Sequence, residues 1–550
     1  MQLPNPVSAS FTILITDIEK GLIKIPQFQR NFVWDLPKSA NLLDSIVKGY
    51  PIGTFIFWKT RERLRSIRNI GGQNFPEANN GEFVNFVLDG QQRLTSLYAS
   101  LKGVSIERED GSKDDFSKMY IDLNAKEDEQ VVILDIQDKE PKEYIKLKDL
   151  LYGGLTLLAS YPESYHSKIE EYKKRIENYR FSLIIMNDAT LDVATDVFTR
   201  INVGGKSLTL FEIMVAKTYD DKRSFDLSEK FKELIERLRP LNYETISDAT
   251  VLQCISMFIK KDCSRKEILR LNKSEFIDVW NEGVEAIESA VEYFRNFLRI
   301  PVSQLLPYNA LIVPFAYYFF KNKDKPTGER SKYLLDYFWR CALSGRFSSS
   351  VETKLGQDIK RIDLILKNKL PKYDWTIDIA EDGITNNGWF SAGRSFVKAI
   401  LCLYAFHQPR SFNDGSLVNI SNDWLKQANS KNYHHFFPKA FLKDRGWDDF
   451  YINNVLNITI VDDFLNKREI GAKAPSRYMK KFIKQNDDIA ATMKTHLIND
   501  IEKFGILNDD YDKFLSNRVK VIQRELKKRI IFQESDNSTQ ISQPVSEDSL

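Results

Sequence analysis

The chain has 550 residues, of which 42% are hydrophobic and 28% are charged. This composition excludes a disordered or fibrous protein, and at roughly 150 residues per domain the length predicts two or three globular domains. The 79 Lys and Arg residues nearly balance the 76 Asp and Glu residues, which leaves a net charge of +3. A polyanionic partner can therefore be argued only from local charge.

The cysteine content and the terminal segment indicate a compartment. No two of the four cysteines form a C-x-x-C pair, which excludes a thiolate zinc site and a disulfide scaffold and is typical of a reducing cytoplasm. The first ten residues lack a signal-peptide pattern. The longest uncharged run, residues 300–320, contains three prolines, which favours a buried helical segment over a membrane helix. We expect a soluble, cytoplasmic protein.

Residues 1–222 mix strand and helix patterns and predict one mixed α/β domain. Apolar runs rich in β-branched and aromatic residues predict strands at 53–58, 83–88, 119–123 and 181–186. Helical patterns cover 40–47 and 92–101. The strand at 83–88 runs directly into Asp89-Gly90 and then into the helix.

Three segments of this domain carry candidate binding residues: IPQFQRNFVW (25–34), DGQQRL (89–94) and FTRINVGGKSL (198–208). The second lies at a strand-to-helix junction, where free backbone N–H groups and the helix dipole favour an anion. Arg30 and Arg93 are placed to meet there, and the third segment adds Arg200, Asn202 and Lys206. The alternatives are an ordinary Asp-Gly turn and aromatic residues that pack in the core. No Walker A sequence is present, which excludes a P-loop.

The rest of the chain changes character. Residues 223–388 have long helical periods and predict a helical middle region. Residues 389–533 contain a further apolar helix at 396–406 and the segment around His434. Residues 534–550 are polar enough to predict a disordered tail. The fold class expected for the whole chain is α+β multidomain.

The stretch from Tyr433 to Tyr478 holds an adjacent pair, His434-His435, followed by Asn457 and Asn466. Its pattern predicts a strand, a loop, a strand and a helix. That order brings the end of the first strand and the first helical turn to either side of one metal-sized gap. A neutral imidazole takes a proton from water near pH 7, and one hard cation stabilises charge on a scissile phosphate.

Basic residues follow this stretch. Residues 467–484 contain seven Lys and Arg residues against Glu469 alone, which suits a phosphate backbone. The residues expected to contact DNA are Lys467, Arg468, Lys473 and Arg477.

The stretch resembles the HNH (ββα-metal) nuclease motif. The resemblance implies that His435 is the general base, that His434 and Asn466 are metal ligands, and that Asn457 braces the loop and orients the base. Members of this family usually have Asp or Glu where His434 stands. Imidazole suits transition metals better than magnesium, so both Mg²⁺ and Mn²⁺ stay open.

The three N-terminal segments, in this order, resemble the ParB-like N-terminal domain of GmrSD-type, modification-dependent (type IV) restriction endonucleases. Relatives often join that domain to a C-terminal HNH domain. The resemblance implies an NTP-binding or NTP-hydrolysing domain that controls DNA cleavage. The nucleotide-site residues that it implies are Asp89, Gly90, Gln91, Gln92 and Arg93, with Gln29 and Arg30 as neighbours.

Together the two resemblances imply a prokaryotic anti-phage endonuclease that acts on double-stranded DNA, modified phage DNA in particular. Two alternatives stay open: a nucleotide-sensing nicking nuclease without selectivity for modified DNA, and a DNA-binding regulator with a degenerate HNH site. The identity of the nucleotide, the DNA modification and the formation of a homo-oligomer also stay open.

Overall fold

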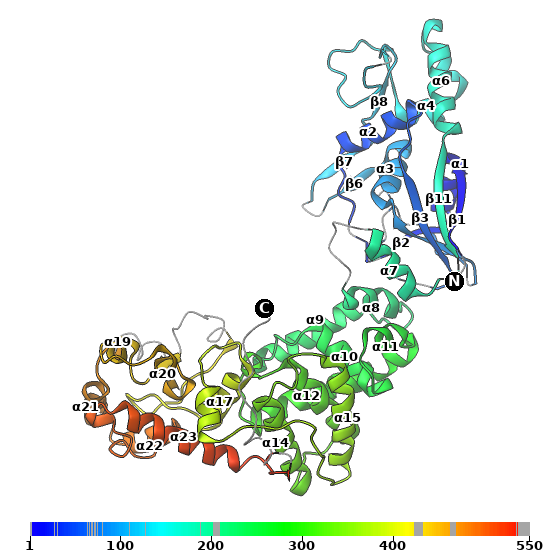
Figure 1. Cartoon of the computed structure of the whole chain (residues 1–550). Coiled ribbons are helices and arrows are strands. Elements are labelled where there is room, and N and C mark those ends of the chain that lie inside the picture. Colours follow the sequence, from blue (N-terminus) through cyan, green and yellow to red (C-terminus); the bar gives the residue numbers. More distant parts are fainter. Residues whose placement is uncertain are drawn as a thin grey trace. The chain divides into compact units, whose positions relative to one another are not determined.

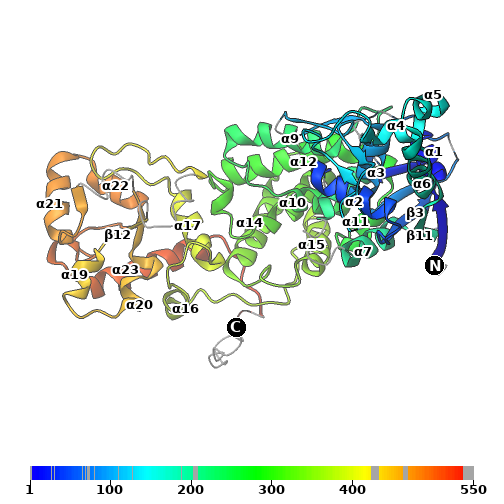
Figure 2. The same cartoon turned by 90° about the horizontal axis from the view of Figure 1, so that it is seen from above.

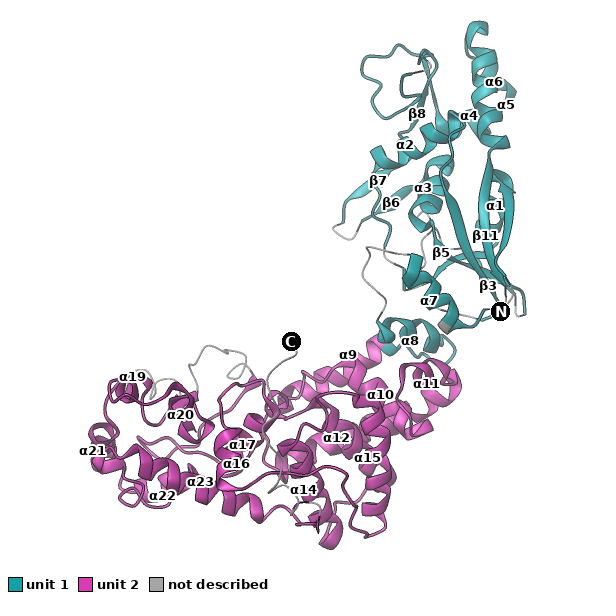
Figure 3. Ribbon diagram, viewed as in Figure 1, with its two compact units in different colours: residues 1–227 teal, residues 228–550 magenta. Residues whose placement is uncertain are grey.

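The computed structural model describes residues 3–536, apart from 27, 30, 63, 65, 68–69, 71–72, 74, 80, 109–110, 127, 188, 202–208, 423–432, 462–468 and 535. The chain forms two compact units, residues 1–227 and residues 228–550 (Figure 3).

A six-stranded mixed sheet organises the first unit (Figure 1). Its strands, in spatial order, are β1 (Asn5–Ser10), β11 (Arg180–Asn187), β3 (Thr54–Thr60), β5 (Val84–Asp89), β2 (Ile23–Pro26) and β4 (Ser66–Ile67). β11 runs parallel to β3 and β2 runs parallel to β5, whereas β3 and β5 are antiparallel. The predicted strands at 53–58, 83–88 and 181–186 are therefore confirmed, and they are neighbours in one sheet.

Helices and two small sheets complete this unit. The helices are α1 (Phe11–Glu19), α2 (Leu36–Val47), α3 (Gln91–Lys102), α4 (Leu147–Tyr152), α5 (Gly154–Ala159), α6 (Glu163–Asn178), α7 (Leu191–Ile201) and α8 (Leu210–Thr218). The small sheets are β6 (Ser105–Glu107) with β7 (Lys113–Asp115), and β8 (Tyr120–Asp122) with β9 (Val132–Ile133) and β10 (Tyr144–Lys146). The predicted helices at 40–47 and 92–101 are confirmed as α2 and α3, which pack against each other.

The second unit begins with long helices, as the periodicity predicts. They are α9 (Leu227–Leu238), α10 (Asp248–Lys260), α11 (Arg265–Arg270), α12 (Lys273–Asn296), α13 (Ile312–Lys321), α14 (Gly328–Leu343) and α15 (Val351–Leu366), with 3₁₀ turns η1 (Arg239–Leu241), η2 (Ser303–Leu305) and η3 (Asn309–Leu311). The uncharged run 300–320 forms η2, η3 and the buried helix α13. Within the described ranges, no helix has the length and apolar character needed to cross a membrane.

The elements that follow gather at one end of this unit (Figures 1 and 2). They are α16 (Glu381–Asn386), α17 (Ser395–Phe406), β12 (Tyr433–His435), α19 (Lys439–Lys443), α20 (Asp449–Ile452), η4 (Val455–Asn457), β13 (Ile458–Ile460), α21 (Pro475–Gln485), α22 (Ile489–Thr495), η6 (Ile506–Asn508) and α23 (Tyr511–Lys527). Their core is largely aromatic and includes Phe412, Phe436, Phe437, Tyr478, Phe482 and Phe514. This aromatic core fixes the β12–β13 pair between the surrounding helices.

The predicted strand, loop and strand are present as β12, the chain that follows it and β13, and Asn457 lies next to the second strand. It ends the 3₁₀ turn η4 immediately before β13. The turn forms because the Asn454 side chain accepts a hydrogen bond from Leu456 N at 3.1 Å and caps it. The predicted helix start that carries Asn466 lies outside the described residues.

Candidate active site

The two candidate histidines lie on the short strand β12, which pairs antiparallel with β13. His434 pairs with Thr459 and His435 pairs with Ile458 across β12 and β13. His434 is buried, with 3% of its surface exposed, whereas His435 is half-buried. Because successive side chains of a strand point to opposite faces, the two imidazole rings have different neighbours.

Asn457 holds the chain that follows His435. The Asn457 side chain is fully buried; its Oδ1 accepts from Phe437 N at 2.9 Å, and its Nδ2 donates to Phe437 O and Ile452 O, both at 3.0 Å. The backbone adds a hydrogen bond from Phe436 N to Asn457 O at 2.7 Å. These are the contacts of a residue that braces a loop, and all of the side-chain bonds go to backbone atoms.

Asn453, which the sequence reasoning missed, is the residue that contacts the His435 ring. Its Oδ1 lies 3.1 Å from His435 Nε2, and its Nδ2 donates to Phe390 O at 3.1 Å. Because a carbonyl accepts only, Phe390 O fixes the orientation of the Asn453 amide, and Oδ1 must then accept from His435 Nε2–H. In the neutral ring this leaves the lone pair on Nδ1.

The protonation state of His435 agrees with that arrangement. Burial, with a smaller contribution from the positive charge of Lys439, lowers the pKa of His435 to about 4, while the hydrogen bond with Asn453 acts in the opposite direction. The ring is neutral at pH 7 and has a free Nδ1 lone pair, which is the form that a general base requires.

His434 and Asn466 were predicted to hold a metal. The His434 ring packs edge-on against Tyr478, with ring centroids 6.4 Å apart, and Tyr478 donates from its hydroxyl to Phe436 O at 2.5 Å. Asn466 lies outside the described residues. In the part of the chain that the structure describes, no group of three His, Cys, Asp or Glu side chains is placed to hold a metal. Of the two predicted metal ligands, His434 is the one that lies among the described residues. Its imidazole nitrogen suits a divalent transition-metal ion better than Mg²⁺.

Of the four basic residues that were expected to contact DNA, the structure describes two. Lys467 and Arg468 lie outside the described residues, whereas Lys473 and Arg477 are exposed. Arg477 belongs to α21, whose buried residues are spaced as one helical face: Pro475, Tyr478, Met479 and Phe482. The outer face of α21 carries exposed cations: Arg477, Lys480, Lys481 and Lys484.

In the first unit, Arg93 is held by its own protein. Its guanidinium donates to Ile52 O at 2.7 Å, to Thr54 O at 3.0 Å and to Asp89 Oδ2 at 2.9 Å. Two glycines make this possible. A Cβ at Gly53 would lie 2.5 Å from Arg93 Nη1, and one at Gly90 (φ 93°) would lie 2.4 Å from the Phe55 ring. The DGQQR motif thus ties the first turn of α3 to β3.

The glutamines of this motif hold the preceding segment. Gln92 Oε1 accepts from Val33 N and Trp34 N, and Gln92 Nε2 donates to Asn31 O and to the neighbouring Gln91 Oε1. Gln29 Nε2 donates to the carbonyls at the end of β5. The carboxylate of Asp89, 34% exposed, is the part of the motif that faces solvent most, beside a helix start without a side-chain cap.

The remaining N-terminal candidates are placed as follows. Phe28 is buried and packs on Phe198 with ring centroids 5.4 Å apart, whereas Phe32 and Trp34 are partly buried and pack against the edge of the core. Arg200 pairs with Asp196 at 2.9 Å. Arg30, Asn202 and Lys206 lie outside the described residues.

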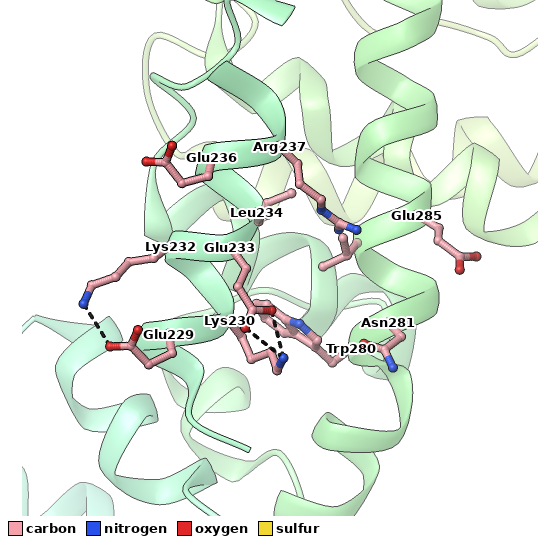
Figure 4. Close-up of a pocket in the computed structure, with 11 residues that line it drawn as sticks. Glu229, Lys230, Lys232, Glu233, Leu234, Glu236, Arg237, Trp280, Asn281 and Glu285 are labelled. Carbon is pink, nitrogen blue, oxygen red and sulfur yellow. Dashed lines mark hydrogen bonds and ion pairs between the residues drawn. The ribbon is translucent and has the colours of Figure 1, made fainter. Parts of the chain in front are cut away.

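A pocket of about 690 Å³ lies between α9 and α12, away from every predicted site residue (Figure 4). Most of its charged lining is already paired: Lys230 with Glu233 at 2.8 Å, Lys232 with Glu229 at 2.9 Å, and Arg237 with Glu288 at 3.0 Å. Such internal pairing leaves little free charge to attract a ligand, so the pocket does not define the site.

Comparison with known proteins bears on both units. Residues 11–219 match the family described as GmrSD restriction endonuclease, N-terminal domain. Over 555 residues the chain is 26% identical to "Uncharacterized protein MJ0686" of Methanocaldococcus jannaschii, with 92% of each chain covered. The family match contains the DGQQR motif, and the archaeal relative extends the similarity over both units.

Proposed function

We propose that this chain, whose residues 11–219 match the family described as GmrSD restriction endonuclease, N-terminal domain, is a DNA endonuclease with an HNH-type site at His435. The proposal includes control by a nucleoside triphosphate in the first unit and a preference for modified phage DNA. The observation that carries it is the chain of contacts from His435 Nε2 to Asn453 Oδ1 and from Asn453 Nδ2 to Phe390 O.

In the proposed reaction His435 Nδ1 takes a proton from water, and the oxygen attacks the phosphorus of the scissile phosphodiester. The P–O bond to the departing sugar oxygen breaks, and that oxygen takes a proton from solvent. The imidazolium that forms keeps its Nε2–H bond to Asn453 Oδ1, which stabilises the new positive charge. Asn457 holds the turn after His435 and so fixes where Nδ1 points. A divalent metal held by His434 and Asn466 would stabilise negative charge on the phosphate and the departing oxygen.

The first experiment measures cleavage of modified and unmodified phage DNA by wild-type protein and His435→Ala, with each divalent metal and each NTP. We expect His435→Ala to cleave about 10²–10⁴-fold more slowly and to bind DNA as before. His166→Ala, a histidine of the first unit, serves as the control. Undiminished cleavage by His435→Ala would contradict the assignment of the base. DNA binding without cleavage in any metal would instead favour the DNA-binding regulator.

The second experiment concerns His434. An imidazole in place of a carboxylate brings no negative charge to the metal, so wild-type protein should prefer Mn²⁺, Co²⁺ or Ni²⁺ to Mg²⁺. His434→Asp should shift that preference toward Mg²⁺. The measurement is the cleavage rate of both proteins in each metal, and identical metal profiles would remove His434 from the metal site.

The third experiment concerns the nucleotide. Arg93→Ala is a poor probe because it would break three internal hydrogen bonds, whereas Asp89→Asn keeps the shape of the side chain. We expect Asp89→Asn to lose phosphate release from NTP, and His435→Ala to retain it. Asp138→Asn, an exposed carboxylate elsewhere in this unit, is the matched control. Unchanged phosphate release by Asp89→Asn would show that the DGQQR motif only connects α3 to β3 and does not take part in NTP hydrolysis.

A further inference from the structure

Three neighbouring aromatic side chains form an exposed cluster in the second unit. Trp389 and Tyr451 are each 40% exposed, and Phe450 is partly buried. The Trp389 and Phe450 rings are nearly parallel, at 18°, with centroids 6.4 Å apart, and Tyr451 stands edge-on to Phe450 at 5.3 Å. These three residues are called the aromatic platform below.

The platform is built onto the residue that contacts the candidate base. Trp389 forms a β-bridge with Asn454, and Phe390 N donates to Asn453 O at 2.8 Å. Gly388 lies so close that a Cβ there would be 2.2 Å from Asn454 Oδ1. Since Asn453 also joins Phe390 O to the His435 ring, the platform and the imidazole are parts of one hydrogen-bonded assembly.

Two exposed cations lie beside this assembly, and the carboxylates of Asp448 and Asp449 next to Phe450 are exposed as well. Arg394 is exposed, and its Nη1 donates to the carbonyl of Trp389 at 3.2 Å. Lys439 is exposed and lies near enough to His435 to act on it electrostatically. Two cations beside exposed aromatic faces provide what a nucleotide needs, a stacking surface for the base and positive charge for its phosphates.

We propose that the aromatic platform stacks an unpaired nucleobase of DNA beside the phosphodiester that His435 attacks. The occupant is an unpaired base because the faces of paired bases are covered by their neighbours in the duplex. Stacking accepts any base, since each has a π-face, so the platform would supply position and not sequence selectivity. This inference rests on the proposed nuclease function and names the form of DNA that the site holds.

The test measures binding of two duplexes, one fully paired and one with a single unpaired 2-aminopurine, in EDTA so that no metal-dependent cleavage occurs. Wild-type protein should bind the second duplex at least about five-fold more tightly and quench its fluorescence, the lower end of what one stacked base contributes. Trp389→Leu should bring the ratio of affinities close to one, and Trp389→Phe should keep most of it. Phe532→Leu replaces an aromatic side chain that is 51% exposed elsewhere in the unit and should leave the ratio unchanged.

The outcomes separate this inference from the proposed function. Equal affinity of wild-type protein for the two duplexes, or fluorescence that is not quenched, would overturn the platform and leave the nuclease proposal standing. An unchanged ratio in Trp389→Leu would also overturn it, even if both affinities fell. Failure of wild-type protein to bind either duplex would overturn the platform, whereas the nuclease proposal is decided separately by the cleavage assay with modified and unmodified DNA.

Discussion

Asn453 has no role in the sequence-based predictions, but in the structure its side chain contacts the His435 ring. It is expected to keep the His435 ring in the tautomer that leaves Nδ1 free. Asn453→Ala removes that acceptor, so we predict a loss of about 100-fold in the single-turnover cleavage rate, as a misplaced catalytic group produces, with unchanged DNA affinity. Quench-flow cleavage together with a DNA-binding titration checks this.

A matched variant makes the Asn453 prediction sharper. Asn422→Ala removes a buried asparagine elsewhere in the unit, whose Nδ2 donates to Asn242 O at 2.8 Å. It should affect stability and leave the cleavage rate of the folded protein unchanged. Equal rates for wild-type protein and Asn453→Ala would show that another group orients His435.

His496 gives a prediction about pH. Its Nε2 donates to Arg410 O at 2.7 Å and its Nδ1 accepts from the Thr459 hydroxyl at 2.6 Å, so the buried ring is neutral. Burial lowers the pKa of His496 to about 3 from the usual 6.5. At a pH between these two pKa values the unfolded chain binds a proton on His496 and the folded chain does not. The stability of the folded chain therefore falls as the pH falls.

The unfolding free energy should change by up to about 1.4 kcal/mol per pH unit, the value for a difference of one bound proton between the folded and unfolded states. His496→Gln lacks the titrating group. The unfolding free energy of wild-type protein should therefore decline relative to that of His496→Gln as the pH is lowered from 6.5 to 4, in urea titrations. A difference that stays constant with pH would show that His496 binds a proton as readily in the folded chain as in the unfolded chain.

At the scale of elements, α21 combines an apolar inner face with a basic outer face. Arg477, Lys480 and Lys484 are exposed, whereas Lys481 pairs with Glu469. If this helix contacts the DNA backbone, Arg477→Ala or Lys480→Ala should weaken binding to all sequences alike and reduce the slope of log K against log salt by about 1. Lys232→Ala, on the unrelated helix α9, should not change that slope.

The segment Asn31–Trp34 is a second element-scale case, because one side chain from α3 holds it. Gln92 accepts from Val33 N at 2.8 Å and donates to Asn31 O at 3.0 Å. Gln92→Leu should therefore remove the protection of the Val33 and Trp34 amides from hydrogen exchange, measured by mass spectrometry. The exposed Gln137→Leu is the control, and preserved protection in Gln92→Leu would show that other contacts suffice.

At the scale of the whole second unit, the end of the described chain closes onto α14. Arg340, fully buried, donates to both carboxylate oxygens of Asp536 at 3.0 and 2.6 Å and to Ile531 O at 2.6 Å. Asp536→Ala leaves part of that buried charge without its partner and should cost about 3 kcal/mol of stability. Deletion of residues 537–550 keeps Asp536 and should leave the melting temperature unchanged, whereas deletion from residue 530 should lower it.

Local sequence patterns were enough to predict several secondary-structure elements and the family of the N-terminal domain. The periods of β-branched and helical residues predicted β3, β5, β11, α2, α3 and α17 because such periods follow from backbone geometry within one element. The DGQQR motif and its neighbouring segments indicated a GmrSD-type N-terminal domain, and the match over residues 11–219 confirms that indication. The roles of His434, His435 and Asn466 remain predictions from the same kind of local spacing.

Contacts between distant segments decided the rest. Asn453 reaches His435 only because residues 388–390 pair with residues 453–455, and Trp389 meets Phe450 for the same reason. Arg93 is occupied by carbonyls about forty residues away, in space that Gly53 leaves free. Spacing along the chain carries no information about such meetings, because they depend on which elements pack together and on which buried polar groups must find partners there.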